Sequence, residues 1–177
     1  MRQFILPLTI SIALIGFAGS AGAACAPAHA AHADAPATGP SSITVSGPSG
    51  SLSVSVADLA AMPHQKVDVV WHGKPASFSG VLLSDVLAKA GAPHGETLRG
   101  AALGSVVVVT AADGYRIVLS LAETDPSLTG RRVLLADSMD GKPLEAADGP
   151  IRLVVEGDAR PARSARMVAG VAVKSVP

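Results

Sequence analysis

The apolar residues of this chain come in short runs broken by glycine and proline, and this pattern limits what the chain can fold into. After residue 42, runs rich in Val, Leu and Ile alternate with turn clusters, which is typical of short strands joined by tight turns. Only residues 83–90 have helical spacing, with one apolar face made of Leu83, Val86, Leu87 and Ala90. The pattern predicts a strand-rich α+β domain with few short helices.

Turn signals predict three hairpins and three further strands. The hairpins span residues 43–56, 67–78 and 106–119, and the further strands span 133–136, 151–155 and 168–176. Short helical turns are expected at 58–62 and 121–125, each followed by a proline. The run 106–109 consists of four valines and is apolar on both faces, which predicts a strand in the middle of a sheet.

The N-terminal segment has the features of an export signal. Arg2 provides a positive charge, residues 4–17 are apolar, and Ala21-Gly22-Ala23 fits a signal-peptidase site. We therefore expect residues 1–23 to be a signal peptide cleaved after Ala23, and the protein to be periplasmic or secreted. Residues 24–42 are rich in Ala, Pro and His and predict a flexible tether, which leaves residues 43–177 as a single domain.

Cysteine and charge content narrow the possible functions. Cys25 is the only cysteine, so the chain can form no internal disulfide. The residue three before it is Gly22, where lipoprotein signals carry a large aliphatic side chain, and this favours a free thiol over a lipid anchor. Basic and acidic residues are balanced at 14 each, without a basic run interleaved with aromatics, which argues against a nucleic-acid partner.

Three blocks of sequence together resemble a known family. They are Phe78-Ser79-Gly80-Val81-Leu82-Leu83-Ser84-Asp85-Val86-Leu87-Ala88-Lys89-Ala90-Gly91, then Ala112-Asp113-Gly114-Tyr115, then Leu144 with Gly149-Pro150-Ile151-Arg152-Leu153-Val154. In this order and spacing they resemble the molybdopterin-binding domain of sulfite-oxidase-like oxidoreductases. The resemblance covers most of residues 43–177. It implies the sulfite-oxidase-like fold, with mixed sheets and few short helices, and molybdopterin as the cofactor.

The resemblance also indicates where a cofactor would bind. In catalytic members the molybdenum is held by the pterin dithiolene and by one protein cysteine, whose soft thiolate suits the metal. The corresponding window, around residues 69–77, has no cysteine, and His72 is its only plausible ligand. A second interpretation, which the sequence favours, places His72 at a hairpin tip facing solvent. We predict no metal site from the sequence.

Arginines are the second group of candidate site residues. In the family, basic residues near the final strand hold the pterin phosphate, which implies Arg152, Arg163 and Arg166 as cofactor-binding residues here. A guanidinium can pair with phosphate or sulfate oxygens in two-point contacts. The alternative is that these arginines lie on a solvated surface and pair with Glu156, Asp158 or Glu123.

No catalytic residue is identified from the sequence. No serine lies in a Gly-x-Ser-x-Gly context. His64 and His94 are next to prolines and are expected in exposed loops, Asp113 is expected to bond backbone N–H groups of its own turn, and Tyr115 is expected to be half-buried.

Three functions are compatible with these features. The favoured one is an exported ligand-binding or accessory module without molybdenum redox catalysis, whose ligand would be a small anion or a pterin. The alternatives are a small periplasmic molybdopterin-dependent oxidoreductase and a docking partner of a membrane redox or sensory protein. The sequence does not indicate an oligomeric state.

Overall fold

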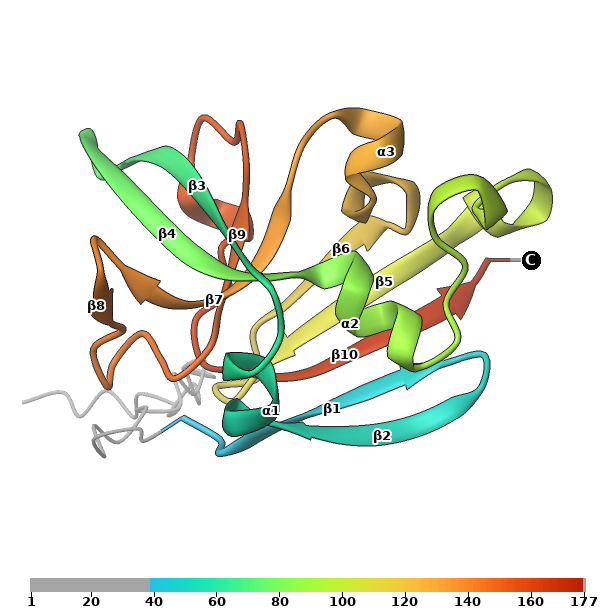
Figure 1. Cartoon of the computed structure of the whole chain (residues 1–177), viewed down its shortest axis with the longest axis horizontal. Coiled ribbons are helices and arrows are strands. Elements are labelled where there is room, and N and C mark those ends of the chain that lie inside the picture. Colours follow the sequence, from blue (N-terminus) through green and yellow to red (C-terminus); the bar gives the residue numbers. More distant parts are fainter. Residues whose placement is uncertain (1–38, 177) are drawn as a thin grey trace, which may run out of the picture. The chain divides into compact units, whose positions relative to one another are not determined.

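Two five-stranded sheets make up most of the structure, a computed structural model that describes residues 39–176 (Figure 1). Sheet A has the strand order β2-β1-β10-β5-β6, and sheet B has the order β3-β4-β7-β8 with β9 also paired to β7. The predicted strand-rich α+β fold is therefore confirmed. The predicted signal peptide, Cys25 and residues 24–38 of the predicted tether lie outside the described residues.

The strands and helices are short, as the turn signals predict. The strands are β1 (Ser42–Gly47), β2 (Gly50–Ser55), β3 (His64–Trp71), β4 (Lys74–Leu82), β5 (Ser105–Ala111), β6 (Arg116–Ser120), β7 (Val133–Met139), β8 (Lys142–Pro143), β9 (Arg152–Val155) and β10 (Val168–Ser175). The α-helices are α1 (Val56–Ala60), α2 (Leu83–Lys89) and α3 (Pro126–Thr129). The 3₁₀ helices are η1 (Gly95–Thr97), η2 (Gly100–Gly104), η3 (Ala122–Thr124) and η4 (Pro161–Arg163).

Sheet A joins the first and last strands of the domain. β1 pairs with β2 in the predicted hairpin and, on its other side, runs parallel to β10. β10 in turn pairs antiparallel with β5. The four valines lie in β5, which pairs with β10 on one side and β6 on the other, so the prediction of a strand within a sheet is confirmed. Of the four, only Val107 and Val109 are fully buried, because only the inward face of β5 is covered by the core.

Sheet B begins with the predicted hairpin of β3 and β4, whose closing pair is Trp71 and Lys74. The two residues of the turn, His72 and Gly73, both have positive φ, as a tight two-residue turn between twisted strands requires. β4 continues directly into α2, which packs against β1, β4 and β7. Figure 1 shows α2 lying between the two sheets.

Apolar residues cover both faces of sheet B. The larger core cluster fills the space between the sheets and includes the predicted stripe of α2, all of whose members are buried: Leu83, Val86, Leu87 and Ala90. A smaller cluster lies on the opposite face of sheet B and includes Val67, Phe78, Leu134 and Val154. Because both faces of sheet B are covered by apolar residues, the sequences of β7 and β9 contain continuous apolar runs rather than alternating apolar and polar residues.

The short helices begin where side chains cap them. Ser55 accepts a hydrogen bond from the Asp58 N–H, and the Asp58 carboxylate accepts one from the Ser55 N–H, so α1 begins two residues earlier than predicted. Pro126 ends the predicted turn at 121–125 but also begins α3, because the first position of a helix tolerates proline. In the part of the chain that the structure describes, no helix is long and apolar enough to cross a membrane.

Gly80 is the position in β4 where a side chain would be most damaging. A Cβ built there would overlap the Leu135 carbonyl and the Ala136 backbone on β7, where the register of the two strands shifts. We expect Gly80→Ala to lower the free energy of unfolding by roughly 1–3 kcal/mol or more, since neither backbone group can move away. Urea unfolding monitored by circular dichroism measures this. Gly104→Ala is the control, because a Cβ at Gly104 meets no atom within 4 Å, and equal losses in both variants would contradict the prediction.

Candidate functional site

Arg152, the first of the predicted cofactor-binding arginines, lies almost completely buried at the start of β9. It is 8% exposed, and its Nη1 lies 2.6 Å from the Asp148 Oδ1. Its Nη2 donates to the Ser164 carbonyl at 3.3 Å, and its guanidinium lies 4.4 Å from the centre of the Trp71 ring, which is a cation–π arrangement. Among the described residues, the Arg152 Nε finds no hydrogen-bond partner. Its charge is therefore largely satisfied by the chain itself.

Arg163 and Arg166 also pair with carboxylates of the same chain. Arg163 donates from Nε and Nη2 to both oxygens of Asp158, at 3.0 and 2.6 Å, and from Nη1 to Glu123 at 3.0 Å. These hydrogen bonds raise the pKa of Arg163 above its ordinary value, and those to Asp158 have the largest effect. Arg166 is more exposed, and its Nε lies 3.7 Å from the Asp113 carboxylate. Of the three arginines, only Arg163 pairs with acidic residues named in the alternative, Asp158 and Glu123. Arg152 is buried rather than solvated and pairs with Asp148, and Arg166 lies near Asp113.

His72, the fourth predicted site residue, is exposed at the tip of the β3–β4 hairpin. Its ring lies edge-on to Trp71, with centroids 5.2 Å apart, and Trp71 in turn makes an edge-to-face contact with Phe78. Trp71 thus connects His72 with Arg152, because its ring contacts both. No local pattern in the sequence indicates this role for Trp71, since a cation–π contact requires only one aromatic ring and one guanidinium, which can be far apart along the chain.

The space beside these residues is small. The hollow lined by Trp71, Asp158 and Ser164 has a volume of about 10 Å³. That is room for about one water molecule, whereas small-molecule sites occupy roughly 300–1,000 Å³. This hollow is therefore too small to hold a pterin.

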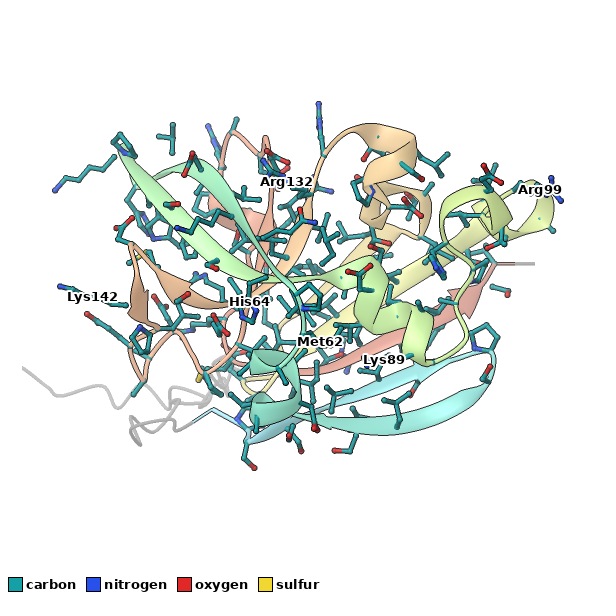
Figure 2. The ribbon with its side chains drawn as sticks, in the orientation of Figure 1. Met62, His64, Lys89, Arg99, Arg132 and Lys142 are labelled. Atoms are coloured by element: carbon teal, nitrogen blue, oxygen red, sulfur yellow. The ribbon has the colours of Figure 1, made fainter. Side chains whose placement is uncertain are left out.

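A long-range ion pair that the sequence did not predict links β3 to β7, the two strands on either side of β4. The His64 Nε2 lies 2.7 Å from the Asp137 Oδ2, and the Nδ1 lies 2.8 Å from the Met62 carbonyl (Figure 2 labels both His64 and Met62). Each ring nitrogen faces an oxygen, so the imidazolium form, which donates from both, suits the site. The hydrogen bond to Asp137, followed by the bond to Met62, raises the pKa of His64 above its ordinary 6.5. Because both of its ring nitrogens are hydrogen-bonded, His64 holds these segments together and is not a free base.

Two other hollows are larger, and Asp137 of this pair lines one of them. One has a volume of about 450 Å³ and is lined by Asp137 together with apolar residues that include Val56, Leu144 and Pro150. A second, of about 410 Å³, shares those three apolar residues and reaches Gly39. The arrangement can accommodate a ligand with an apolar body and one hydrogen-bond donor, which differs from the anion expected at the arginines.

Two smaller predictions have different outcomes. Asp113 accepts a hydrogen bond from the Tyr115 N–H at 2.9 Å, so its predicted role in its own turn is confirmed. Tyr115 is 49% exposed and so half-buried as predicted, but it is not part of the core, and its hydroxyl donates to the Ala162 carbonyl at 2.7 Å.

Two five-stranded sheets with one helix between them define the fold class, and comparison with known protein families identifies the family. The model of the oxidoreductase molybdopterin binding domain matches residues 32–177, so the chain belongs to that family. Among solved structures, it is similar to the sulfane dehydrogenase SoxCD from Paracoccus pantotrophus, with a TM-score of 0.55 and 18% sequence identity. The match covers 76% of this chain and 39% of the SoxCD chain, and it supports the expected fold. No curated protein matches the chain.

The residues present do not fit a cysteine-ligated molybdenum centre. Cys25, the only cysteine, precedes the matched residues 32–177. Within residues 39–176, no three His, Cys, Asp or Glu side chains come together as a potential metal site. A soft metal centre of this kind needs a thiolate from the protein, and the β3–β4 hairpin offers only the exposed His72.

The raised pKa of His64 makes the ion pair dependent on pH. Its stabilisation is fully present below the pKa of an unfolded histidine, about 6.5, and is lost as the pH rises through the higher pKa of the folded state. We expect an NMR titration of His64 to show a midpoint above 6.5 that falls in Asp137→Asn. An unchanged His64 midpoint in Asp137→Asn would contradict the assignment.

Arg163 and Arg166 allow a paired test of the ion pairs. Removing Arg163 leaves Asp158 and Glu123 without their shared partner, so Arg163→Ala should lower the free energy of unfolding by about 1 kcal/mol, given that the group is partly exposed. Arg166→Ala removes one long contact and should cost less than about 0.5 kcal/mol. Thermal and urea unfolding measure both, and a larger loss in Arg166→Ala would show that the structural contacts do not set the stability here.

Proposed function

We propose that this protein is an exported member of the molybdopterin-binding domain family that acts as a ligand-binding or accessory module and carries out no molybdenum redox catalysis. The observation that carries the proposal is the set of side chains that could bind the cofactor. The matched region has no cysteine, and its arginines already pair with carboxylates of the same chain. The fold of the family is thus present without the thiolate that its catalytic chemistry uses.

The charges around the arginines favour an accessory role over anion binding. Arg152, Arg163 and Arg166 together face four carboxylates: Asp148, Asp158, Glu123 and Asp113. An incoming phosphate would have to displace an acidic group that is held next to each guanidinium by the chain. A ligand-free docking or scaffolding role needs no such displacement.

Export is part of the proposal and rests on the N-terminal pattern. The positive Arg2, the apolar residues 4–17 and the small residues before Ala24 support cleavage near Ala23. Fractionation of the native cells, with N-terminal sequencing of the mature protein, tests it. Full-length protein recovered with the cytoplasmic fraction would contradict export.

The redox part is tested by expressing the chain in a host with a working molybdenum-cofactor pathway. We expect molybdenum in the purified protein, measured by mass spectrometry, to stay at the level of an unrelated exported protein. Released-pterin fluorescence should stay at the same background if the role is accessory. Pterin without molybdenum would support the ligand-binding form of the proposal.

Near-stoichiometric molybdenum together with pterin would overturn the proposal. It would favour the small oxidoreductase instead, with the metal held by the pterin sulfurs. Cys25→Ser is the matched control in that case, because it removes the only thiol of the chain. Molybdenum that survives this substitution cannot be held by the N-terminal cysteine.

A further inference from the structure

The hollow of about 450 Å³ lies where β7, the start of α1 and the loop between β8 and β9 come together. Its volume is within the range of roughly 300–1,000 Å³ that small-molecule sites occupy. Arg152, Arg163 and Arg166, the arginines considered above, are not among the described residues that line it. Those residues are apolar or small apart from one carboxylate, and they are Val56, Asp137, Ser138, Gly141, Pro143, Leu144 and Pro150.

Backbone hydrogen bonds hold the walls of this hollow in place. The Val56 N–H donates to the Ser41 carbonyl at 3.0 Å and fixes the start of α1. The Leu144 N–H donates to the Asp137 carbonyl at 3.0 Å and fixes the loop after β8 against β7. A ligand would therefore enter a site that is already formed, and its binding would not have to order these segments.

Asp137 is the only charged side chain among the described residues that line the hollow. A carboxylate offers about four acceptor positions on its two oxygens, and the His64 Nε2 occupies one of them, on Oδ2. The side chain of Asp137 is only 24% exposed, and a charge-assisted hydrogen bond to a partly buried group is stronger than one in water. Lys142, the basic residue of β8, does not line the hollow, and Figure 2 shows it well apart from His64.

The charge of His64 depends on Asp137 more than on its other neighbours. On β4, the residue opposite His64 is the uncharged Val81. The nearest charged residue of β3 itself is Lys66, which is exposed, and the charged residue of α1 is Asp58. Among these groups, Asp137 is the one whose charge and hydrogen bond raise the pKa of His64.

We propose that this hollow binds a small organic ammonium ion, whose apolar body fills the hollow and whose N–H groups donate to the Asp137 carboxylate beside His64. The inference deepens the ligand-binding form of the proposed function and rests on it. One carboxylate in an apolar lining complements an apolar molecule with one positive charge, whereas it repels an anion. A bound ammonium also places a second positive charge next to the imidazolium, so its binding favours the neutral form of His64.

Phenethylamine is a suitable probe, and phenethyl alcohol is its neutral counterpart of the same shape. We expect calorimetry to show that the amine binds more tightly at about pH 8.5 than at about pH 5.5, since alkylamines stay protonated up to about pH 10. At the higher pH, the alcohol should bind about tenfold more weakly or worse.

The same site is observed directly by NMR titration of His64. Saturating amine should lower the midpoint of His64, and the alcohol should not. By reciprocity, each pH unit by which the amine lowers the midpoint requires about a tenfold rise in its affinity from low to high pH. A midpoint that the bound amine leaves unchanged overturns the proposal.

Asp137→Asn removes the charge and keeps the shape of the side chain. It should weaken amine binding at about pH 8.5 by about tenfold or more. Asp68→Asn is the matched control, because Asp68 is exposed on β3 and is not among the described lining residues of the hollow. It should leave the affinity within about twofold. Equal weakening by both substitutions overturns the proposal, and the wild-type measurements decide it even if Asp137→Asn does not fold.

The outcome is separable from that of the proposed function when both are measured on one preparation. A protein without molybdenum that binds no amine at either pH, or that binds the alcohol equally well, overturns only the ammonium site. Near-stoichiometric molybdenum with pterin overturns the proposed function, whatever the amine result.

Discussion

The buried guanidinium of Arg152 constrains how three segments of this domain come together. A charge removed from water costs several kcal/mol unless it is paired and hydrogen-bonded. Here the pairing is supplied by Asp148 from the loop before β9, by the Ser164 carbonyl after η4, and by the Trp71 ring at the end of β3. Each of these segments must therefore hold its place, because losing one leaves a buried charge with fewer partners.

The same requirement bears on function. A guanidinium fork fits a phosphate and a carboxylate equally well, so an arginine in a family position does not by itself indicate a ligand. In this chain the carboxylates are held close to the forks by the fold, which gives them a much higher effective concentration than a free anion has. Arg163, at the end of η4, thus links Asp158 in the loop after β9 to Glu123 in η3.

Local patterns of the sequence predicted local structure well. The apolar spacing of residues 83–90 predicted α2, and the turn residues predicted all three hairpins. These features depend on neighbours within a few positions. The order of the three motif blocks predicted the family, because it reflects the fold of the whole domain.

Contacts between residues that are far apart in the sequence could not be predicted from it. The parallel pairing of β1 with β10 closes sheet A across nearly the whole domain, and no local pattern specifies it. The pair of His64 and Asp137 joins residues 73 positions apart, and it explains why a histidine expected in an exposed loop has a raised pKa. The sequence could suggest acidic partners for the arginines, but it could not show which acidic residue pairs with which arginine, since acidic residues are spread along the chain.

The absence of a thiolate from the family position does not weaken the fold, because the hairpin that would carry it is stabilised by other means. β3 and β4 pair over eight residues, and the smaller cluster, which includes Phe78 and Val67, packs the hairpin against the other strands of sheet B. No bond to a metal is needed to hold the turn at His72. A fold whose stability does not depend on its catalytic group can persist without the catalytic activity and still present the same binding surfaces. The fold of this chain therefore does not by itself establish its function.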